Sequence, residues 1–245
     1  MDRKKMADRQ EMVHNRESAS EPGDLPASFE VDVARLIDLI ARSGEEIEEG
    51  ARENLMGLVE AIFRWNKTVN LVSRKDIARL VSYHFCDAAS LLPLLRPRRD
   101  LRVLDLGGSN GLPGLVLATL SAHIKLTICD SRRKRREFLE EVCGARAAFE
   151  IDRVDSEAFR AKHSDGFDLI VARAVTRFRL LLKWCLPLLK PGGRLVAYKG
   201  SRSIEEVNRA KSYLFDHGGS MVAVVASPWA VECNPLRLFV IAKRA

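Results

Sequence analysis

The chain has 245 residues, of which 47% are hydrophobic and 30% charged, and it carries a formal net charge of +7. This content suffices for one large α/β domain or for one domain with a helical appendage. No apolar run approaches the roughly 18 residues of a membrane span, and the charged start MDRKKMADRQ lacks the apolar segment of a signal peptide. Five cysteines without Cys-x-x-Cys spacing argue against a zinc site or a disulfide framework. We therefore expect a cytoplasmic protein with no membrane contact and no metal, whose modest basicity permits a nucleic-acid partner.

The first hundred residues predict helices and no strands. Residues 1–27 are rich in charge, Ser, Glu and Pro and have no apolar period, so we expect a disordered charged tail there. Apolar residues then recur at helical spacing, with Ser28 as an N-cap and Gly44 as a stop signal. The predicted helices cover residues 28–44, 47–66 and 78–95. We therefore predict an N-terminal helical segment over residues 28–98.

Residues 99–245 alternate between strand-like and helix-like patterns, which is typical of a parallel sheet covered by helices. Strands are predicted at 102–106, 124–129, 147–151, 168–173, 193–199, 220–226 and 237–242, and helices at 112–121, 132–143, 156–162, 177–189 and 203–215. Only a loop with Pro228 and Pro235 joins the last two strands, so they would pair antiparallel. Seven strands ending in an antiparallel hairpin indicate the Rossmann-like α/β fold of class I methyltransferases, which use S-adenosylmethionine (SAM).

A glycine-rich loop stands between the first predicted strand and its helix, in the stretch RVLDLGGSNGLPGLVLA over residues 102–118. The dinucleotide pattern Gly-x-Gly-x-x-Gly is not met, because Ser109 replaces its second glycine, and no Gly-Lys-[Ser/Thr] follows. The chain also lacks the Tyr-x-x-x-Lys pair of short-chain dehydrogenases. Asp105, two residues before Gly107, suits the positive sulfonium of SAM and would repel a pyrophosphate. We therefore expect SAM as the ligand, outside the carboxyl ends of the strands.

Several short motifs follow one another in a specific order along the chain. They are Trp65-Asn66-Lys67, Asn70-Leu71, His84-x-x-Asp87, Gly111-Leu112-Pro113-Gly114, Cys129-Asp130-Ser131, Arg173-Ala174, Trp184-Cys185 and Lys199-Gly200. From about residue 50 onward, this set resembles the bacterial glucose-inhibited division protein B family. The resemblance implies a SAM-dependent methyltransferase that acts on N7 of a guanine in 16S ribosomal RNA. Its partner would be ribosomal RNA or the small ribosomal subunit.

One position departs from the family pattern and keeps two alternatives open. The family's loop usually has glycine where this chain has Ser109. If that position needs a positive φ, serine costs on the order of 1 kcal/mol. The chain could therefore be a non-catalytic RNA-binding relative that has lost the cofactor. It could also be a methyltransferase of the same fold that acts on another RNA or on a small molecule.

The resemblance implies most of the predicted cofactor contacts. Gly107 and Leu112 match cofactor contacts of the family, through close backbone approach and an apolar wall, although Leu112 at a helix start could equally be a core residue. Val154 and Asp155 match a pair that meets the adenine, although Asp155 could also be an ordinary surface acid. Arg173 would lie beside the cofactor and the target base, and its alternative is an ion pair with Asp105 or Asp168.

Two further carboxylates are predicted from their places at strand ends. Asp105 would face the charged end of SAM or, alternatively, accept N–H groups of the loop as a structural carboxylate. Asp130 follows the second strand, where a carboxylate can bind the two ribose hydroxyls. Its alternative is to cap the next helix, but Ser131 could do this instead.

The strongest charge run, Arg132-Arg133-Lys134-Arg135-Arg136, stands at the start of a predicted helix. Cations at a helix N-terminus oppose the helix dipole, which favours phosphate contact over a merely solvated face. The predicted RNA-binding residues are Arg132, Arg133, Lys134, Arg136 and Lys199.

No catalytic acid or base is predicted, because N7 of guanine has a free lone pair and no proton to lose. Catalysis would then consist of positioning and electrostatics. His84 and Asp87 lie one helical turn apart and could shape the entry to the cleft. Alternatively, His84 is a hydrogen-bonded histidine that packs the helical segment on the sheet.

Overall fold

The computed structural model describes residues 25–95, 100–108, 110–144, 147–150, 152–173, 175–200, 204–226, 229 and 237–244. The predicted tail lies outside the described residues up to residue 24, and Ser109 lies outside them as well. None of the described helices has the length and apolar character that crossing a membrane requires. The division into a tail, a helical segment and a sheet domain remains a prediction.

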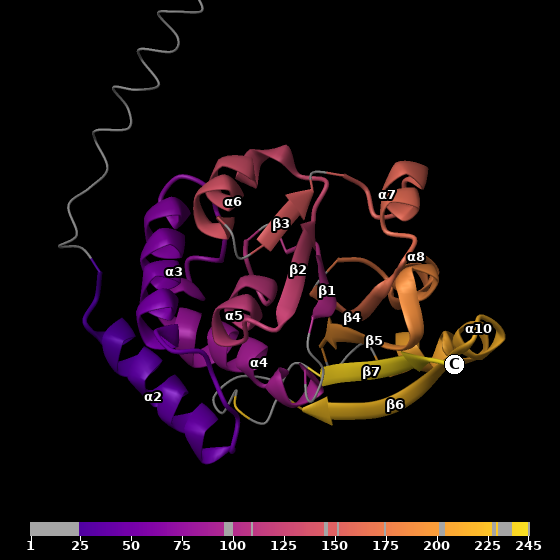
Figure 1. The fold of residues 1–245 in the computed structure, drawn as a ribbon, viewed down its shortest axis with the longest axis horizontal. Helices are drawn as coiled ribbons and strands as arrows, with labels where there is room; N and C mark the ends of the chain where they lie inside the picture. The colour runs from indigo at the N-terminus through magenta and orange to yellow at the C-terminus, as the bar shows by residue number, and fades with distance from the viewer. Residues whose placement is uncertain are drawn as a thin grey trace, which may run out of the picture.

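Seven strands form one sheet in the middle of the molecule (Figure 1). They are β1 (Leu101–Leu106), β2 (Ile124–Cys129), β3 (Ala147–Glu150), β4 (Phe167–Arg173), β5 (Leu189–Lys199), β6 (Gly219–Ala226) and β7 (Arg237–Lys243). The strand order is β3-β2-β1-β4-β5-β7-β6. Strands β1 to β5 pair in parallel, and β7 is antiparallel to both of its neighbours. The predicted α/β sheet of the class I SAM-dependent methyltransferases, with its antiparallel C-terminal hairpin, is confirmed.

The order of the strands places a ligand site at the carboxyl ends of β1, β2 and β4. The chain builds outward from β1 to β3 and then returns to the other side of β1 with β4. Asp105 of β1 is level with Ile128 of β2 and with Val171 of β4. Ligands of open α/β sheets bind outside the strands at such a reversal of strand order. The residues that follow these three strands therefore converge on one place.

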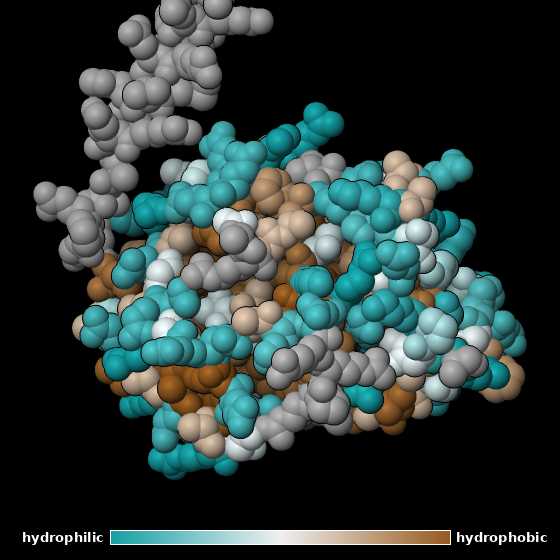
Figure 2. Space-filling model, in the orientation of Figure 1, coloured by the Kyte–Doolittle hydropathy of each residue, from teal (hydrophilic) through white to brown (hydrophobic). Residues whose placement is uncertain are grey.

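Helices cover both faces of the sheet and give the molecule three layers (Figure 1). One face packs against α2 (Ser28–Arg42), α3 (Ala51–Asn66), α4 (Cys86–Ala89), α5 (Gly114–Leu120) and α6 (Arg136–Cys143). The other face packs against α7 (Glu157–Lys162), α8 (Phe178–Cys185), α9 (Ile204–Arg209) and α10 (Lys211–Asp216). Val103 lies in the first core and Leu104 in the second, because successive strand residues point to opposite faces. The N-terminal helices thus share one core with the sheet, and the face of the molecule in Figure 2 carries hydrophilic and hydrophobic residues side by side.

The single helix predicted over residues 78–95 is wrong. This stretch consists of a 3-10 turn at Ile77–Arg79, a π-helical turn at Leu80–Phe85, α4, and a 3-10 turn at Leu92–Leu95. Pro93 lacks an N–H group and disfavours helical geometry in the residue before it, so the helix cannot run on to Leu95.

Three other predicted helices are shorter or divided, each for a local reason. The helix predicted at 132–143 begins only at Arg136, because Arg132 is extended and a 3-10 turn follows it. The helix predicted at 177–189 ends at Cys185, just before Pro187, and β5 begins earlier than expected. The helix predicted at 203–215 is divided at Ala210, whose N–H donates to Val207 O in a tighter turn.

Candidate cofactor site and RNA contacts

The loop after β1 has a shape that requires glycine. Gly107 and Gly111 have φ values of 80° and 77°, in the left-handed region that favours glycine. A Cβ on Gly107 would lie 2.8 Å from Val175 Cγ2, and a Cβ on Gly108 would lie 2.3 Å from Asp105 Cγ. The loop therefore lies directly against the Asp105 carboxylate, and its bare backbone is open to a ligand.

Asp105 is fully buried beneath this loop. Its Oδ2 accepts a 2.7 Å hydrogen bond from Gly114 N, and its Oδ1 has no hydrogen-bond partner among the described residues. Burial raises the pKa of Asp105 to about 7. The hydrogen bond from Gly114 N agrees with the alternative role of Asp105, a structural carboxylate that accepts N–H groups of the loop. Asp105 forms no ion pair among the described residues, so its buried carboxylate would nevertheless attract a cation bound nearby.

A cavity of about 530 Å³ lies at the carboxyl ends of β1, β2 and β4, within the size range of small-molecule sites. Its wall contains five of the predicted cofactor residues: Gly107, Asp130, Val154, Asp155 and Arg173. Asp105 and Leu112 do not line it, and Leu112 is a core residue of the first hydrophobic cluster. The site search in the sequence missed Val175, Thr176 and Trp184, which also form the wall. The sequence offers Trp184 only as part of a family motif and as a tryptophan that could stack on a base or lie in the core, and not as a cofactor residue.

Asp130 is held by its neighbour Arg132. The Arg132 Nε and Nη2 atoms donate to Asp130 Oδ1 and Oδ2 at 3.1 and 2.9 Å, and Arg132 N donates to Oδ1 at 2.8 Å. The Asp130 side chain is only 3% exposed, whereas that of Arg132 is 59% exposed. The predicted ribose ligand thus faces the cavity beneath a solvent-exposed arginine of the predicted RNA-binding run.

A second arginine holds Asp155 in the same way. Arg153 Nε and Nη2 each donate to the Asp155 carboxylate at 3.0 Å, and these bonds lower the pKa of Asp155. Val154, between them, is buried in the second hydrophobic core. The backbone of this stretch and the Asp155 carboxylate form one side of the cavity.

Arg173 lies beside groups from distant parts of the chain. Its Nη1 lies 3.9 Å from Oδ2 of the fully buried Asp87, and its guanidinium lies 5.5 and 5.8 Å from the rings of Tyr83 and Tyr198. The alternative of an ion pair with Asp105 or Asp168 is wrong, because among the described residues Arg173 pairs with Asp87 and Asp168 pairs with Lys190 at 2.7 Å. Arg173 is thus a positive charge at the cavity wall, beside the buried carboxylate of Asp87.

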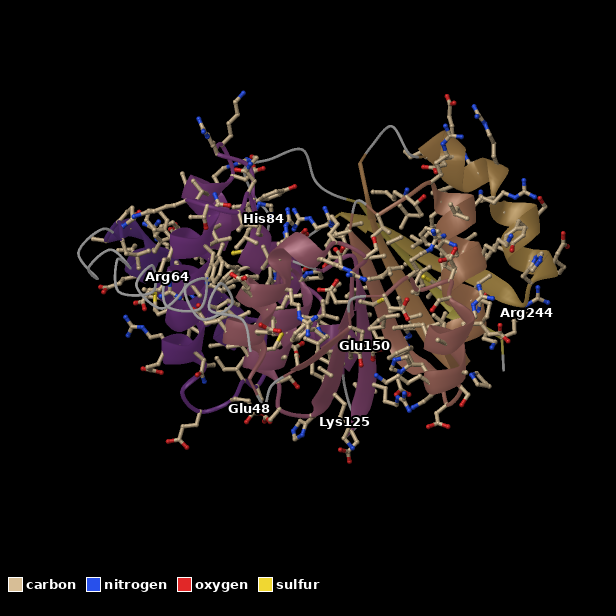
Figure 3. The ribbon with its side chains drawn as sticks, turned by 90° about the horizontal axis from the view of Figure 1, so that it is seen from above. Glu48, Arg64, His84, Lys125, Glu150 and Arg244 are labelled. Atoms are coloured by element: carbon tan, nitrogen blue, oxygen red, sulfur yellow. The ribbon has the colours of Figure 1, made fainter. Side chains whose placement is uncertain are left out.

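His84 lies in the N-terminal helical segment (Figure 3), and the charge of Arg173 acts on its ring. It is 7% exposed, and neither ring nitrogen has a hydrogen-bond partner among the described residues. The expectation of a hydrogen-bonded histidine is therefore wrong. Burial, reinforced by the charge of Arg173, lowers the pKa of His84 to about 3, so the ring is neutral at pH 7.

Most described side chains of the basic run have partners inside the protein. Besides Arg132, Arg135 Nη2 donates to Asn70 O at 2.5 Å, and Arg136 Nε donates to Glu140 Oε1 at 2.8 Å. Arg133 is exposed. The Lys134 side chain lies outside the described part of the chain.

Lys199 is not a surface residue. Its Nζ donates to Thr176 O at 2.6 Å and to Glu206 Oε2 at 3.4 Å, and its side chain is only 12% exposed. Glu206 also accepts a short hydrogen bond from Phe178 N. Lys199 therefore ties the end of β5 to the loop after β4 and to α9.

Comparison with known proteins shows the family of this chain. The family model of GidB, the rRNA small subunit methyltransferase G, matches residues 51–228. The chain belongs to this family. The ribosomal RNA small subunit methyltransferase G of Symbiobacterium thermophilum is 34% identical over 194 residues, which are 76% of this chain and 79% of the relative. That of Staphylococcus saprophyticus is 27% identical and covers 88% of this chain and 91% of the relative.

A solved structure agrees in fold. The branched-chain polyamine synthase C9 mutein of Thermus thermophilus superimposes with a TM-score of 0.52 at 15% identity, covering 78% of this chain and 62% of that chain. This likeness concerns the fold alone. The predicted family is thus confirmed, and the chain is a SAM-dependent methyltransferase of ribosomal RNA.

Proposed function

We propose that this chain transfers a methyl group to N7 of a guanine in 16S ribosomal RNA, in the cytoplasm and on the small ribosomal subunit or its RNA. The observation that carries the proposal is the cavity itself. It brings Gly107, Asp130, Asp155 and Arg173 together at the reversal of strand order. These residues come from four separate stretches of a chain that belongs to the methyltransferase G family.

The residues around the cavity fit SAM. The glycine loop offers backbone to a ligand, since Gly107 lines the cavity. The Asp130 carboxylate suits the two ribose hydroxyls, and the 154–155 stretch suits the adenine through a backbone N–H and a carboxylate. The positive Arg173 suits an anionic or carbonyl oxygen. The buried Asp105, whose Oδ1 lacks a described partner, favours a positive charge beyond the loop.

The protein's contribution to the reaction is positioning. SAM supplies the methyl group on a positively charged sulfur. The lone pair of guanine N7 would form a bond to the methyl carbon while the carbon–sulfur bond breaks and neutral S-adenosylhomocysteine leaves, so no side chain needs to remove a proton. Arg173, beside the buried Asp87, can fix an oxygen of the base or of the cofactor. The cavity wall keeps the reacting groups in line, which is the larger part of such catalysis.

The test is calorimetric titration with SAM, followed by methyl transfer to 16S ribosomal RNA from cells that lack this modification. We expect micromolar binding of SAM, about −8 kcal/mol, and label in N7-methylguanine. Asp130→Ala should weaken SAM binding at least about tenfold, because hydrogen bonds to a charged group contribute about 1.5–3 kcal/mol. Unchanged affinity in this variant would refute the ribose assignment. Absence of SAM binding in the unmodified protein would favour the RNA-binding relative without a cofactor.

A further inference from the structure

The exposed side of α8 carries three cations that the basic run does not include. Arg177, Arg179 and Lys183 are all exposed, and α8 contains no acidic residue. Among the described residues, no ion pair involves any of the three. Arg132 and Arg136 of the basic run, by contrast, are ion-paired. The cations of α8 are thus available to an anionic partner.

These cations surround a hollow of about 520 Å³ between α8 and α10, which lie on the same side of the sheet (Figure 1). Leu180, Tyr213 and His217 complete its lining. The Tyr213 and His217 rings stack with centroids 3.8 Å apart, and the Arg179 guanidinium lies 5.3 Å from the Tyr213 ring. Aromatic rings beside cations are what single-stranded nucleic acids use, because bases stack on the rings and phosphates meet the charges.

This hollow connects to the cofactor cavity through shared residues. A third hollow is lined by Thr176, Arg177, Lys199, Glu206 and Arg209. Thr176 also lines the cofactor cavity, and Arg177 also lines the hollow on α8. The three hollows therefore all border the loop after β4, from the cavity to the exposed side of α8.

The geometry points to the exposed side of α8, together with the Tyr213–His217 pair, as the surface that binds a single-stranded segment of the RNA next to the target guanine. This inference rests on the proposed function and specifies where the substrate docks. The strand's phosphates meet Arg177, Arg179 and Lys183, and one base stacks beside Tyr213. The target base then enters the cavity beside Thr176, which lines both the cavity and the neighbouring hollow.

The test compares three double variants of the full chain, each of which removes two positive charges. Arg179→Ala with Lys183→Ala removes the α8 contacts, and Arg133→Ala with Arg136→Ala tests the basic run. The control is Arg35→Ala with Arg42→Ala, because both arginines are about three-quarters exposed on α2 at the opposite end of the molecule (Figure 1). Each protein is titrated with 16S ribosomal RNA at several salt concentrations. SAM binding is measured separately, and kcat and KM are measured for methyl transfer.

We expect the α8 variant to raise KM for RNA at least tenfold, with kcat and SAM affinity close to those of the unmodified protein. The slope of log affinity against log salt should fall by about 1.4, which corresponds to two phosphate contacts of a single strand. Tyr213→Leu should weaken RNA binding at least fivefold, since stacking on an aromatic ring contributes about 1–3 kcal/mol per base. The α2 control should change neither KM for RNA nor the affinity for RNA by more than about twofold.

Three results would overturn the inference. An α8 variant no weaker than the α2 control would remove this surface from the RNA interface. A larger loss in the Arg133 and Arg136 variant would assign the contact to the basic run. A loss with whole small subunits but not with free RNA would indicate a ribosomal protein as the partner. If the unmodified protein binds RNA but transfers no methyl group, the proposed function fails. The RNA affinities of the three double variants would still show whether RNA binds to the exposed side of α8.

Discussion

The two arginine-rich regions of this protein differ in what their side chains already contact. The run at 132–136 is the denser one in sequence, yet Asp130, Asn70 and Glu140 bind three of its arginines. The exposed side of α8 has fewer cations, and no acid lies within that helix. Charge density in a sequence therefore does not measure charge that is available to a partner. Availability depends on the acids and carbonyls that the fold brings beside each cation.

The positions of the cations along their helices explain this difference for Lys183 alone, because Arg177 and Arg179 stand at the N-terminal end of α8 as the run does at that of α6. The run stands at the start of a helix, where a positive charge opposes the helix dipole and gains most from a nearby acceptor. Lys183 stands in the last turn of α8, where the dipole favours a cation and no acceptor is needed. The comparison yields three predictions, on Asp87, Asp105 and Arg132.

Arg173 is more buried than Arg132 and Arg153, and its partner Asp87 is fully buried. Removal of the Asp87 charge should therefore have the largest effect on stability. Asp87→Asn keeps the shape of the side chain but leaves the guanidinium, which is 17% exposed, without its carboxylate. We expect a loss of about 3 kcal/mol in the free energy of unfolding, measured with urea, since breaking a buried pair costs about 3–5 kcal/mol. SAM affinity should fall as well, because Arg173 is then free to turn away from the cavity.

A double variant separates the pair from a general packing defect. Arg173→Met removes the charge and keeps the length of the side chain. In combination with Asp87→Asn, it should recover part of the lost stability, with a coupling energy of at least about 1 kcal/mol. Recovery of SAM binding is not expected, because Arg173 itself is missing. Strictly additive losses in stability would show that Asp87 does not act through Arg173.

The carboxylates of the site differ in the same way as the arginines. Asp130 and Asp155 each form an ion pair with an arginine, whereas Asp105 forms none among the described residues, and burial raises its pKa to about 7 although the more distant charge of Arg173 opposes this shift. Asp105 is therefore largely protonated below pH 7 and ionised above it. A cation bound nearby favours the ionised form of Asp105 and therefore lowers its raised pKa. The affinity of the site for a cation then rises as the pH increases through 7. The preference for SAM over S-adenosylhomocysteine, which has a neutral sulfur, should rise about three- to tenfold from pH 6 to pH 8.

The control for this prediction is Asp105→Asn. The amide oxygen still accepts the hydrogen bond from Gly114 N but does not ionise. In this variant the ratio of the two affinities should be the same at both pH values. If the ratio of SAM affinity to S-adenosylhomocysteine affinity changes equally with pH in both proteins, another group is the one that titrates. Asp105 would then have only its structural role in the loop.

The fold and part of the site could be predicted because they follow from local patterns. Alternating strands and helices predict a parallel sheet, and parallel strands bring Gly107, Asp130 and Arg173 to one edge wherever the loops go. The pairing of Arg173 with Asp87 could not be predicted, because it joins residues 86 positions apart in contact across two packed layers. The interior position of Lys199 was missed for a similar reason. Its partners Thr176 and Glu206 lie in other elements, and a terminal strand lysine usually reaches solvent.

The smallest expected effect distinguishes the two roles that Arg132 could have. In the structure its guanidinium binds both oxygens of Asp130, the same atoms that the ribose hydroxyls would use. Arg132→Ala should therefore tighten SAM binding about two- to fivefold, since an exposed ion pair contributes about 0.2–1 kcal/mol. Arg136→Ala is the matched control, because its ion pair with Glu140 lies outside the lining of the cavity and its loss should leave SAM affinity unchanged. A weaker affinity for RNA and an unchanged affinity for SAM would instead make Arg132 the phosphate contact that the sequence predicts. Tighter SAM binding would make it a side chain that the cofactor displaces from Asp130.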